Sequence, residues 1–199
     1  MGSRIMHLII ANEIADRLSI GNKQAFLIGG IAPDAVSPKD LSHFFEGDHE
    51  EFTRKIAYEK FYQKYPSKDE YILGYYTHLI ADDMWLKGFF IPWLKNRMEN
   101  EESIFEKYHG DFRLLNSKLL HHYQLDVQLL DGMEHIDLID LEEVKASDVK
   151  EFVPYVKEDM NYSMEDLEAK LQVFTFEQIR GYVETSVEKS LLKLKEIMK

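Results

Sequence analysis

A histidine and an aspartate interrupt an otherwise apolar and aromatic stretch that spans residues 74–86 of this chain. The two residues, His78 and Asp82, are four positions apart, so on a helix their side chains lie on the same face. A carboxylate among apolar side chains loses its hydration, which is costly unless a hydrogen-bond partner or a metal ion replaces the water. The pattern therefore predicts either a buried His–Asp hydrogen bond or a helix that carries two metal ligands.

Spacing alone does not separate these two alternatives. A second pair with the same spacing, His122 and Asp126, lies in residues 108–131, where the hydrophobic pattern also predicts a helix. The surroundings of each pair and the positions of the other histidines must therefore decide.

Composition restricts the kinds of site and partner that this chain can have. Its 199 residues are 45% hydrophobic and 13% aromatic, which is typical of one globular domain, here residues 1–199. The net charge of −12 opposes binding to long nucleic acids and anionic membranes, although a bound dication could still attract a phosphate substrate. Because the chain has no cysteine, disulfides, thiolate zinc sites and cysteine nucleophiles are excluded, and a metal must be held by histidine and carboxylate.

The N-terminal residues bear on location. Glu13, Asp16 and Arg17 interrupt the first apolar segment, which argues against a signal peptide. No apolar run approaches the roughly 20 residues of a membrane-spanning helix. We therefore expect a cytoplasmic protein without a transmembrane segment.

Helical patterns dominate the chain, and they predict an all-α fold, a single-domain bundle of many helices. The expected helices cover residues 5–18, 24–31, 49–65, 68–90, 108–131 and 175–198, with short helices within 137–162. Glycine and proline predict a loop over residues 32–48, and this loop holds Asp34 and His43. No internal repeat and no convincing hairpin is visible in the sequence.

Five residues give expected helix boundaries or breaks. Ser67 and Glu70 have the spacing of a capping box at the start of the helix over 68–90, and Gly132 suits the end of the helix over 108–131. Pro92 and Pro154 are expected to bend or break the helices around them.

Five short segments follow one another in an order that carries a family resemblance. They are His7 on the first helix, F-L-I-G-G-I-A-P-D at 26–34, S-H-F at 42–44, G-Y-Y-T-H-L-I-A-D at 74–82 and H-Y-Q-L-D at 122–126. This order resembles the zinc-dependent phospholipase C family over about the first two thirds of the chain. The resemblance implies an all-helical fold of the phospholipase C and zinc nuclease type. It also implies a phosphoesterase that uses a metal-bound hydroxide.

The resemblance further implies a set of zinc ligands. His78 and Asp82 would hold a central pair of ions, with Asp82 bridging them. His7 would bind one ion of the pair, and Asp34 together with His43 would bind the other. Asp34 could also accept the proton of the attacking water, which makes it the candidate catalytic residue.

A third ion is implied at His122 and Asp126. Members of the family often have another histidine shortly after the H-x-x-x-D segment, whereas residues 83–90 contain Lys87 and no histidine. We therefore expect the second pair either to join the His78/Asp82 cluster or to hold a weak, exchangeable ion, giving two or three zinc ions in all.

Two neighbouring residues have lesser expected roles. His121 lies about 100° around the helix from His122, so both cannot easily face one ion, and we regard His121 as a reserve ligand. Asp83, next to the expected bridging residue, could accept a hydrogen bond from a ligand histidine and orient it.

Three functions compete at this stage. The first is a metal-dependent phosphoesterase that acts on a small phosphoester or a phospholipid-like substrate, with zinc or another divalent ion. The second, a helical phosphohydrolase of the HD-domain type, needs an adjacent His-Asp dipeptide, which this chain lacks. The third is a helical binding or scaffold protein that keeps the fold without catalysis, and its metal content would distinguish it from the enzymes.

Overall fold

Helices account for nearly all of the regular structure, so the all-α prediction is confirmed. The computed structural model describes residues 2–48 and 50–198. The helices are α1 (Arg4–Leu18), α2 (Lys23–Ile31), α3 (Tyr58–Lys64), α4 (Glu70–Trp85), α5 (Lys95–Asn100), α6 (Ile104–Tyr123), α7 (Ala146–Asp159), α8 (Met164–Glu168) and α9 (Phe176–Ile197). A π-helical segment, η2 (Leu86–Leu94), and three short 3₁₀ helices, η1 (Ala32–Ala35), η3 (Val127–Leu130) and η4 (Met133–His135), lie between them.

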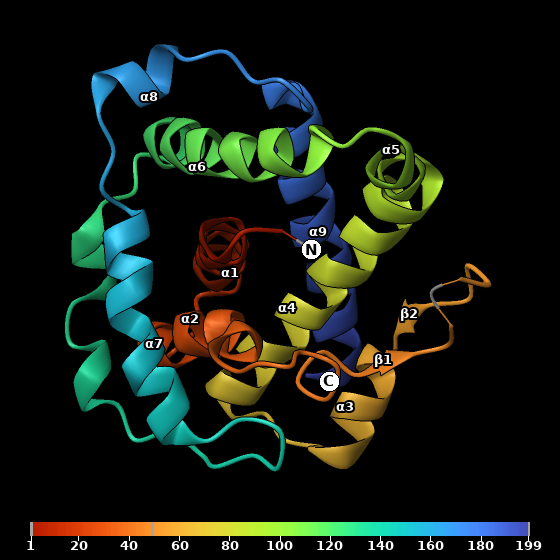
Figure 1. Ribbon diagram of the computed structural model, residues 1–199. Helices are drawn as coiled ribbons and strands as arrows, with labels where there is room; N and C mark the ends of the chain where they lie inside the picture. The colour runs from red at the N-terminus through yellow and green to blue at the C-terminus, as the bar shows by residue number, and fades with distance from the viewer. Residues whose placement is uncertain (1, 49, 199) are drawn as a thin grey trace.

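The two N-terminal helices form the centre of the molecule. Helices α4 and α9 lie on one side of α1 and α2, α7 lies on the other side, and α6 crosses one end (Figure 1). All residues from Ile5 to Asn12 of α1 are buried, because this helix is enclosed by its neighbours. Polar residues on α1, such as His7, are therefore held inside the core.

Helix α2 packs against α4 with backbone almost touching backbone. A methyl group built on Gly29 would lie 2.1 Å from the carbonyl oxygen of Tyr71. One built on Gly74 would lie 2.0 Å from the carbonyl oxygen of Phe26. Neither position has room for a side chain, so glycine is required on both helices for the crossing to be this close.

We expect Gly74→Ala to destabilise the protein strongly, by about 3 kcal/mol or more, because the added methyl group meets backbone rather than a movable side chain. Denaturant unfolding would measure the loss. Gly110→Ala is the matched control, since Gly110 also lies within a helix but has no atom within 4 Å of a built methyl group. That change should raise stability by about 0.5–1 kcal/mol through helix propensity. Equal effects of the two substitutions would contradict the close crossing.

The helix predicted over residues 49–65 was largely wrong. Residue 49, where that prediction began, lies outside the described residues. The chain instead forms a short antiparallel ladder, β1 (Phe45–Glu46) with β2 (Lys55–Ile56), before α3 begins at Tyr58. No convincing hairpin pattern in the sequence predicts this ladder, which projects to one side in Figure 1.

Local hydrogen bonds explain why this segment is not helical. The Asp48 carboxylate accepts hydrogen bonds from the backbone N–H groups of Glu50 and Glu51, at 2.6 and 3.0 Å. Such bonds from a side chain to nearby backbone compete with helix formation. Gly47 adopts a φ of 78° and is close to Thr53, so the chain turns here.

Two predicted boundaries of α4, the helix expected over residues 68–90, were also wrong. Helix α4 begins at Glu70 with Asp69 as its N-cap, because the Asp69 carboxylate accepts from the Tyr71 N–H at 2.9 Å. Ser67 instead accepts from the Asp69 N–H at 3.0 Å, so the expected capping box with Glu70 does not form. At the other end the helical path continues through Pro92 as the π-helical segment η2.

The C-terminal part combines confirmed and corrected predictions. Helix α9 starts after Thr175, whose side chain and that of Gln178 form a capping box, close to the predicted boundary. Helix α7 continues through Pro154, so this residue does not break it. Gly132 precedes η4 with a φ of 79° and does not end α6.

A buried aspartate that the sequence analysis missed fixes the chain just before α9. Asp111 of α6 accepts hydrogen bonds from the backbone N–H groups of Gln172, Val173 and Phe174, at 2.8, 2.7 and 3.0 Å. These three bonds replace the water that the buried carboxylate loses. They hold α9 to α6 and thereby close one end of the bundle.

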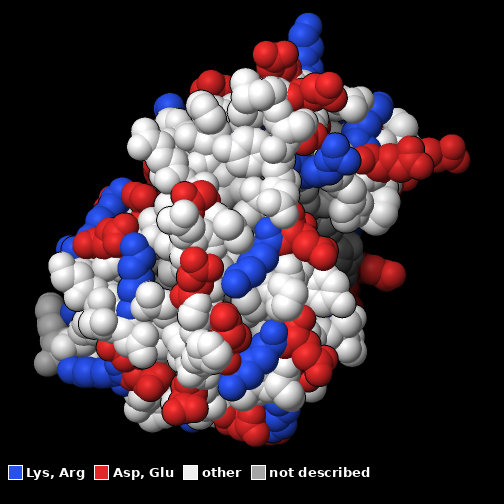
Figure 2. Space-filling view, turned by 90° about the vertical axis from the view of Figure 1, so that its left-hand side faces the viewer, with Lys and Arg blue, Asp and Glu red and all other residues white. Residues whose placement is uncertain are grey.

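No described helix is both long and apolar enough to cross a membrane. On the face that carries α7 and α8, acidic and basic side chains are interspersed, as Figure 2 shows.

Candidate metal centre

Five of the seven predicted ligands meet in one buried cluster. His7 comes from α1, His78 and Asp82 from α4, Asp34 from η1, and His43 from the loop before β1. His7, His43, His78 and Asp82 are at most 1% exposed. The close packing of α1, α2 and α4 brings these distant parts of the sequence together.

The Asp82 carboxylate lies at the middle of the cluster. Its Oδ2 is 3.2 Å from His43 Nε2 and 3.4 Å from His78 Nε2, while its Oδ1 is 3.2 Å from His7 Nε2. Oδ2 therefore faces His43 and His78, and Oδ1 faces His7. This is the arrangement that the bridging role of Asp82 requires.

Backbone carbonyls orient two of the histidines. His78 Nδ1 donates to the carbonyl oxygen of Gly30 at 2.8 Å, and His43 Nδ1 lies 3.1 Å from the carbonyl oxygen of Lys39. The Ser42 hydroxyl, 2.9 Å from His43 Nδ1, donates its own proton to the Pro33 carbonyl, so Nδ1 must carry the hydrogen. In their neutral forms both rings therefore direct an Nε2 lone pair into the cluster, as metal-bound histidines do.

A hydrogen bond from α4 fixes the position of the loop that carries His43. The Tyr75 hydroxyl donates to the carbonyl oxygen of Ser42 at 2.6 Å, and Ser42 is fully buried. His43 thus has a defined position although it lies outside the helices.

When His43 and His78 are neutral, their Nε2 atoms and the Asp82 oxygens are all hydrogen-bond acceptors that face one another. Only a positive charge can stabilise this arrangement. His43 Nε2 lies 3.2 Å from His78 Nε2, and neither Asp82 oxygen has a hydrogen-bond donor among the described residues. Zinc bonds of 2.0–2.1 Å place tetrahedral ligands about 3.3 Å apart. The three distances among His43 Nε2, His78 Nε2 and Asp82 Oδ2, 3.2 to 3.4 Å, fit that value.

Asp34 is suited to be the fourth ligand of this ion. Its Oδ1 lies 3.5 Å from His43 Nε2, and the ligand atoms of Asp34, His43 and His78 all lie within 4.8 Å of one another. Two histidines and two carboxylates match the donor types that zinc and similar divalent ions accept. In donor type these residues therefore fit a divalent metal ion.

His7 provides a less complete second group. Its ring stacks on His78 with 3.7 Å between ring centroids, and neither ring nitrogen has a hydrogen-bond partner among the described residues. His7, His78 and Asp82 could hold an ion between them, but the one free nitrogen of His78 can bind only one metal. A second ion would therefore depend on His7 and Asp82 Oδ1, with most of its coordination left open.

The pKa values describe the cluster without metal. Burial lowers the pKa of His78 to about 4, helped by the charge of His7. Burial also acts to lower the pKa of His43, but the adjacent Asp34 and Asp82 carboxylates outweigh it and raise that pKa to about 9. Burial opposes ionisation of both aspartates as well, yet the nearby cations hold their pKa values well below the usual range. A proton on His43 then supplies the positive charge that the carboxylates require.

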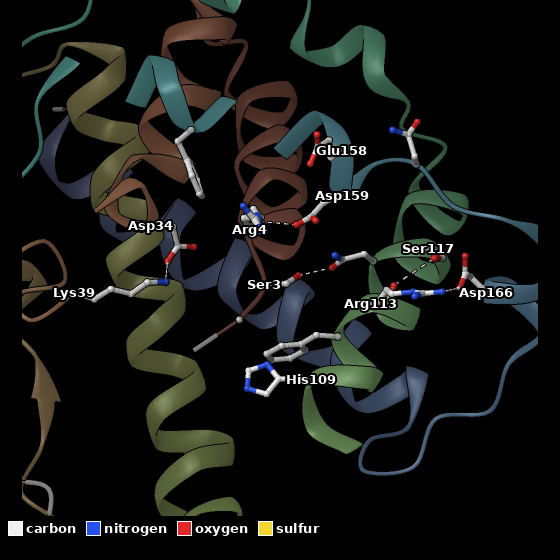
Figure 3. Close-up of a pocket in the computed structure, with 15 residues that line it drawn as sticks. Ser3, Arg4, Asp34, Lys39, His109, Arg113, Ser117, Glu158, Asp159 and Asp166 are labelled. Atoms are coloured by element: carbon white, nitrogen blue, oxygen red, sulfur yellow. Dashed lines mark hydrogen bonds and ion pairs between the residues drawn. The ribbon is translucent and has the colours of Figure 1, made fainter. Parts of the chain in front are cut away.

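The cluster adjoins a cavity of about 700 Å³, a volume in the usual range for small-molecule sites. Asp34 and Lys39 lie on one side of it and the Arg113–Asp166 pair lies on the opposite side (Figure 3). Asp34 thus belongs both to the ligand cluster and to the cavity wall. Lys39, which sequence reasoning missed, forms an ion pair with Asp34.

The structure does not bring His122 and Asp126 into the cluster. Helix α6 ends at Tyr123 because Gln124 takes a left-handed conformation with a φ of 54°, so the predicted helix over 124–131 was wrong. The two side chains therefore do not share a helix face. His122 is exposed beside Phe176, and Asp126 is exposed and caps η3 through a hydrogen bond from the Gln128 N–H at 2.9 Å.

Two lesser expectations also find no support. His121, the reserve ligand, is exposed at the end of α6. Asp83 does not orient a ligand histidine, because its carboxylate pairs with Lys87 at 2.8 Å and with Lys189 at 3.2 Å. Lys87, where a further histidine was sought, thus pairs with the buried Asp83 one turn earlier, while Lys189 links Asp83 to α9.

Comparisons of the chain with family models, with curated proteins and with solved structures found no match. The case for a function therefore depends on the geometry of the cluster and the cavity.

We expect zinc to stabilise the chelator-treated protein. At zinc concentrations about 100-fold above the dissociation constant, binding contributes about 2.7 kcal/mol, which should raise Tm by roughly 5–10 °C. Asp82→Asn should abolish most of this rise, because it removes the central carboxylate. His121→Gln, which changes an exposed histidine, should retain it. The assignment fails if Asp82→Asn shows the same zinc-dependent rise as the unchanged protein.

Because the second group of ligands, which contains His7, is incomplete, we expect two zinc ions that bind with unequal affinity. During a chelator titration followed by elemental analysis, one zinc should leave first and the other should persist. His7→Gln should remove the weaker ion and leave the stronger one, since His43, His78, Asp82 and Asp34 are unchanged. Loss of both ions in this variant, or of neither, would contradict the assignment of one stronger and one weaker zinc ion.

Proposed function

We propose that this chain is a metal-dependent hydrolase of phosphoesters, with zinc as the preferred ion. The observation that carries the proposal is the double position of Asp34, which lies beside His43 in the ligand cluster and also lines the cavity. A substrate in the cavity would thus be next to the ion. A site that served only to stabilise the fold would need no such opening.

The proposed chemistry suits the ligands present. A divalent ion held by histidine and carboxylate can supply hydroxide near neutral pH and offset the charge of a phosphate group. His43 and His78 would hold the ion with their Nε2 atoms, and their Nδ1–H bonds to backbone carbonyls would keep the rings oriented. Asp34, which lines the cavity, would accept a proton from the attacking water.

The family resemblance of the sequence supports the same proposal. The five residues that it implies as ligands of the central ions are those that lie together in the structure. A non-catalytic scaffold would have no need of two carboxylates and three histidines in one buried cluster, since their desolvation is costly.

The zinc-loaded protein should hydrolyse at least one member of a panel of phosphomonoesters and phosphodiesters, and chelation should abolish that activity. Asp34→Asn should lower kcat by about 100-fold or more, the usual contribution of a positioned acid or base. Asp40→Asn is the matched control. Asp40 lies six residues away in the same loop but is 65% exposed and pairs with Arg54, so its change should leave kcat intact.

Stoichiometric zinc without hydrolysis of any panel member would overturn the enzymatic proposal and favour the scaffold. If Asp34→Asn leaves kcat unchanged, Asp34 takes no part in the reaction.

A further inference from the structure

Most of the residues that line the cavity beside the cluster have polar or charged side chains. Among the 15 described residues that line it, only Phe112 and Phe152 have apolar side chains. Acyl chains placed here would gain little from burial, because apolar contact is what stabilises them. The lining therefore suits a small hydrophilic molecule.

Three cations face this cavity, each paired with a carboxylate (Figure 3). Arg4 lies 2.5 Å from Asp159, and Arg113 lies 2.8 Å from Asp166. Neither of these aspartates belongs to the ligand cluster, so the two arginine charges stay offset whether or not metal is bound.

Lys39 differs because its partner Asp34 is a candidate ligand. Once a dication is bound, its two charges offset those of Asp34 and Asp82, and the charge of Lys39 is left uncompensated beside the ion. The lysine side chain is 40% exposed, so its ammonium group is accessible from the cavity. Glu158 also lines the cavity but lies next to Asp159 and away from Lys39 (Figure 3), so the positive charge is local to Lys39 and the ion, where an anionic ligand would meet it.

We infer that Lys39 binds the phosphoryl oxygens of the substrate, and that this substrate is a small, water-soluble phosphoester rather than a phospholipid. The inference rests on the proposed function for its substrate class. The anion site at Lys39 can be tested separately, because inorganic phosphate serves as a probe without catalysis. An ammonium group beside a bound ion would add a charge-assisted hydrogen bond to a phosphate oxygen.

The first experiment measures inorganic phosphate binding by calorimetry, with zinc-loaded protein freed of excess zinc. Lys39→Met should weaken binding about tenfold or more, and Lys39→Arg should stay within about threefold of the unchanged protein. Lys60→Met is the matched control, because Lys60 is 64% exposed, pairs with Glu46 and does not line the cavity. Zinc content should not change, since His43 is oriented by the backbone carbonyl of Lys39.

Phosphate affinity that Lys39→Met leaves unchanged would overturn the inference, as would absence of phosphate binding to the unchanged protein. Loss of zinc together with phosphate in Lys39→Met would overturn it too, because the lysine would then act through the ion. Weaker binding at constant zinc content supports it.

The second experiment compares a soluble glycerophosphodiester with phosphatidylcholine vesicles at equal phosphodiester concentration. We expect faster hydrolysis of the soluble compound, with KM raised about tenfold in Lys39→Met and kcat changed less. Preferred hydrolysis of vesicles would overturn the substrate class. If neither compound nor any other phosphoester is hydrolysed while phosphate binding still depends on Lys39, the proposed function fails and the anion site stands.

Discussion

Where α2 crosses α4, the backbones of the two helices touch at Gly29 and Gly74, and the position of the candidate metal ligands depends on that contact. The crossing places the carbonyl oxygen of Gly30, one residue beyond the contact, 2.8 Å from His78 Nδ1. A wider separation, such as a side chain at either glycine would force, would remove the partner that orients the His78 ring. One packing constraint between two helices thus becomes a constraint on which imidazole nitrogen is available for metal.

The same crossing explains how a buried cluster of ionisable groups can be stable. Two carboxylates in the core are strongly desolvated, and mutual attraction within the cluster offsets that cost only with good geometry. Without metal, a proton on His43 supplies the positive charge, and the adjacent Asp34 and Asp82 carboxylates raise its pKa to about 9. With metal, the same atoms surround a dication. The cluster therefore has two ways to balance its charge, and both use the same rigid positions.

The sequence predicts the central part of this arrangement well and its periphery poorly. His78 and Asp82 could be recognised because they interrupt an apolar helix, so burial followed from their surroundings as well as from spacing. His122 and Asp126 have equal spacing, but Gln124 ends their helix, and both are exposed. Spacing implies a shared face only where the helix is continuous, and a left-handed residue is not visible in a hydrophobic pattern. The helix boundaries near Asp48 and Asp69 were missed for a related reason, because local side-chain bonds decided them.

Lys39 shows what a search for ligand residues leaves out. A lysine in a polar loop has no periodicity and no ligand chemistry, so nothing in the sequence connects it with Asp34 five residues earlier. The loop conformation makes that connection, since it directs the Lys39 carbonyl toward His43 and the Lys39 ammonium toward Asp34. Backbone and side chain of one residue thereby contact two different candidate ligands. In an acidic protein this arrangement places a positive charge where a bound dication would leave it unpaired, and an anion that enters the cavity would meet it beside the ion.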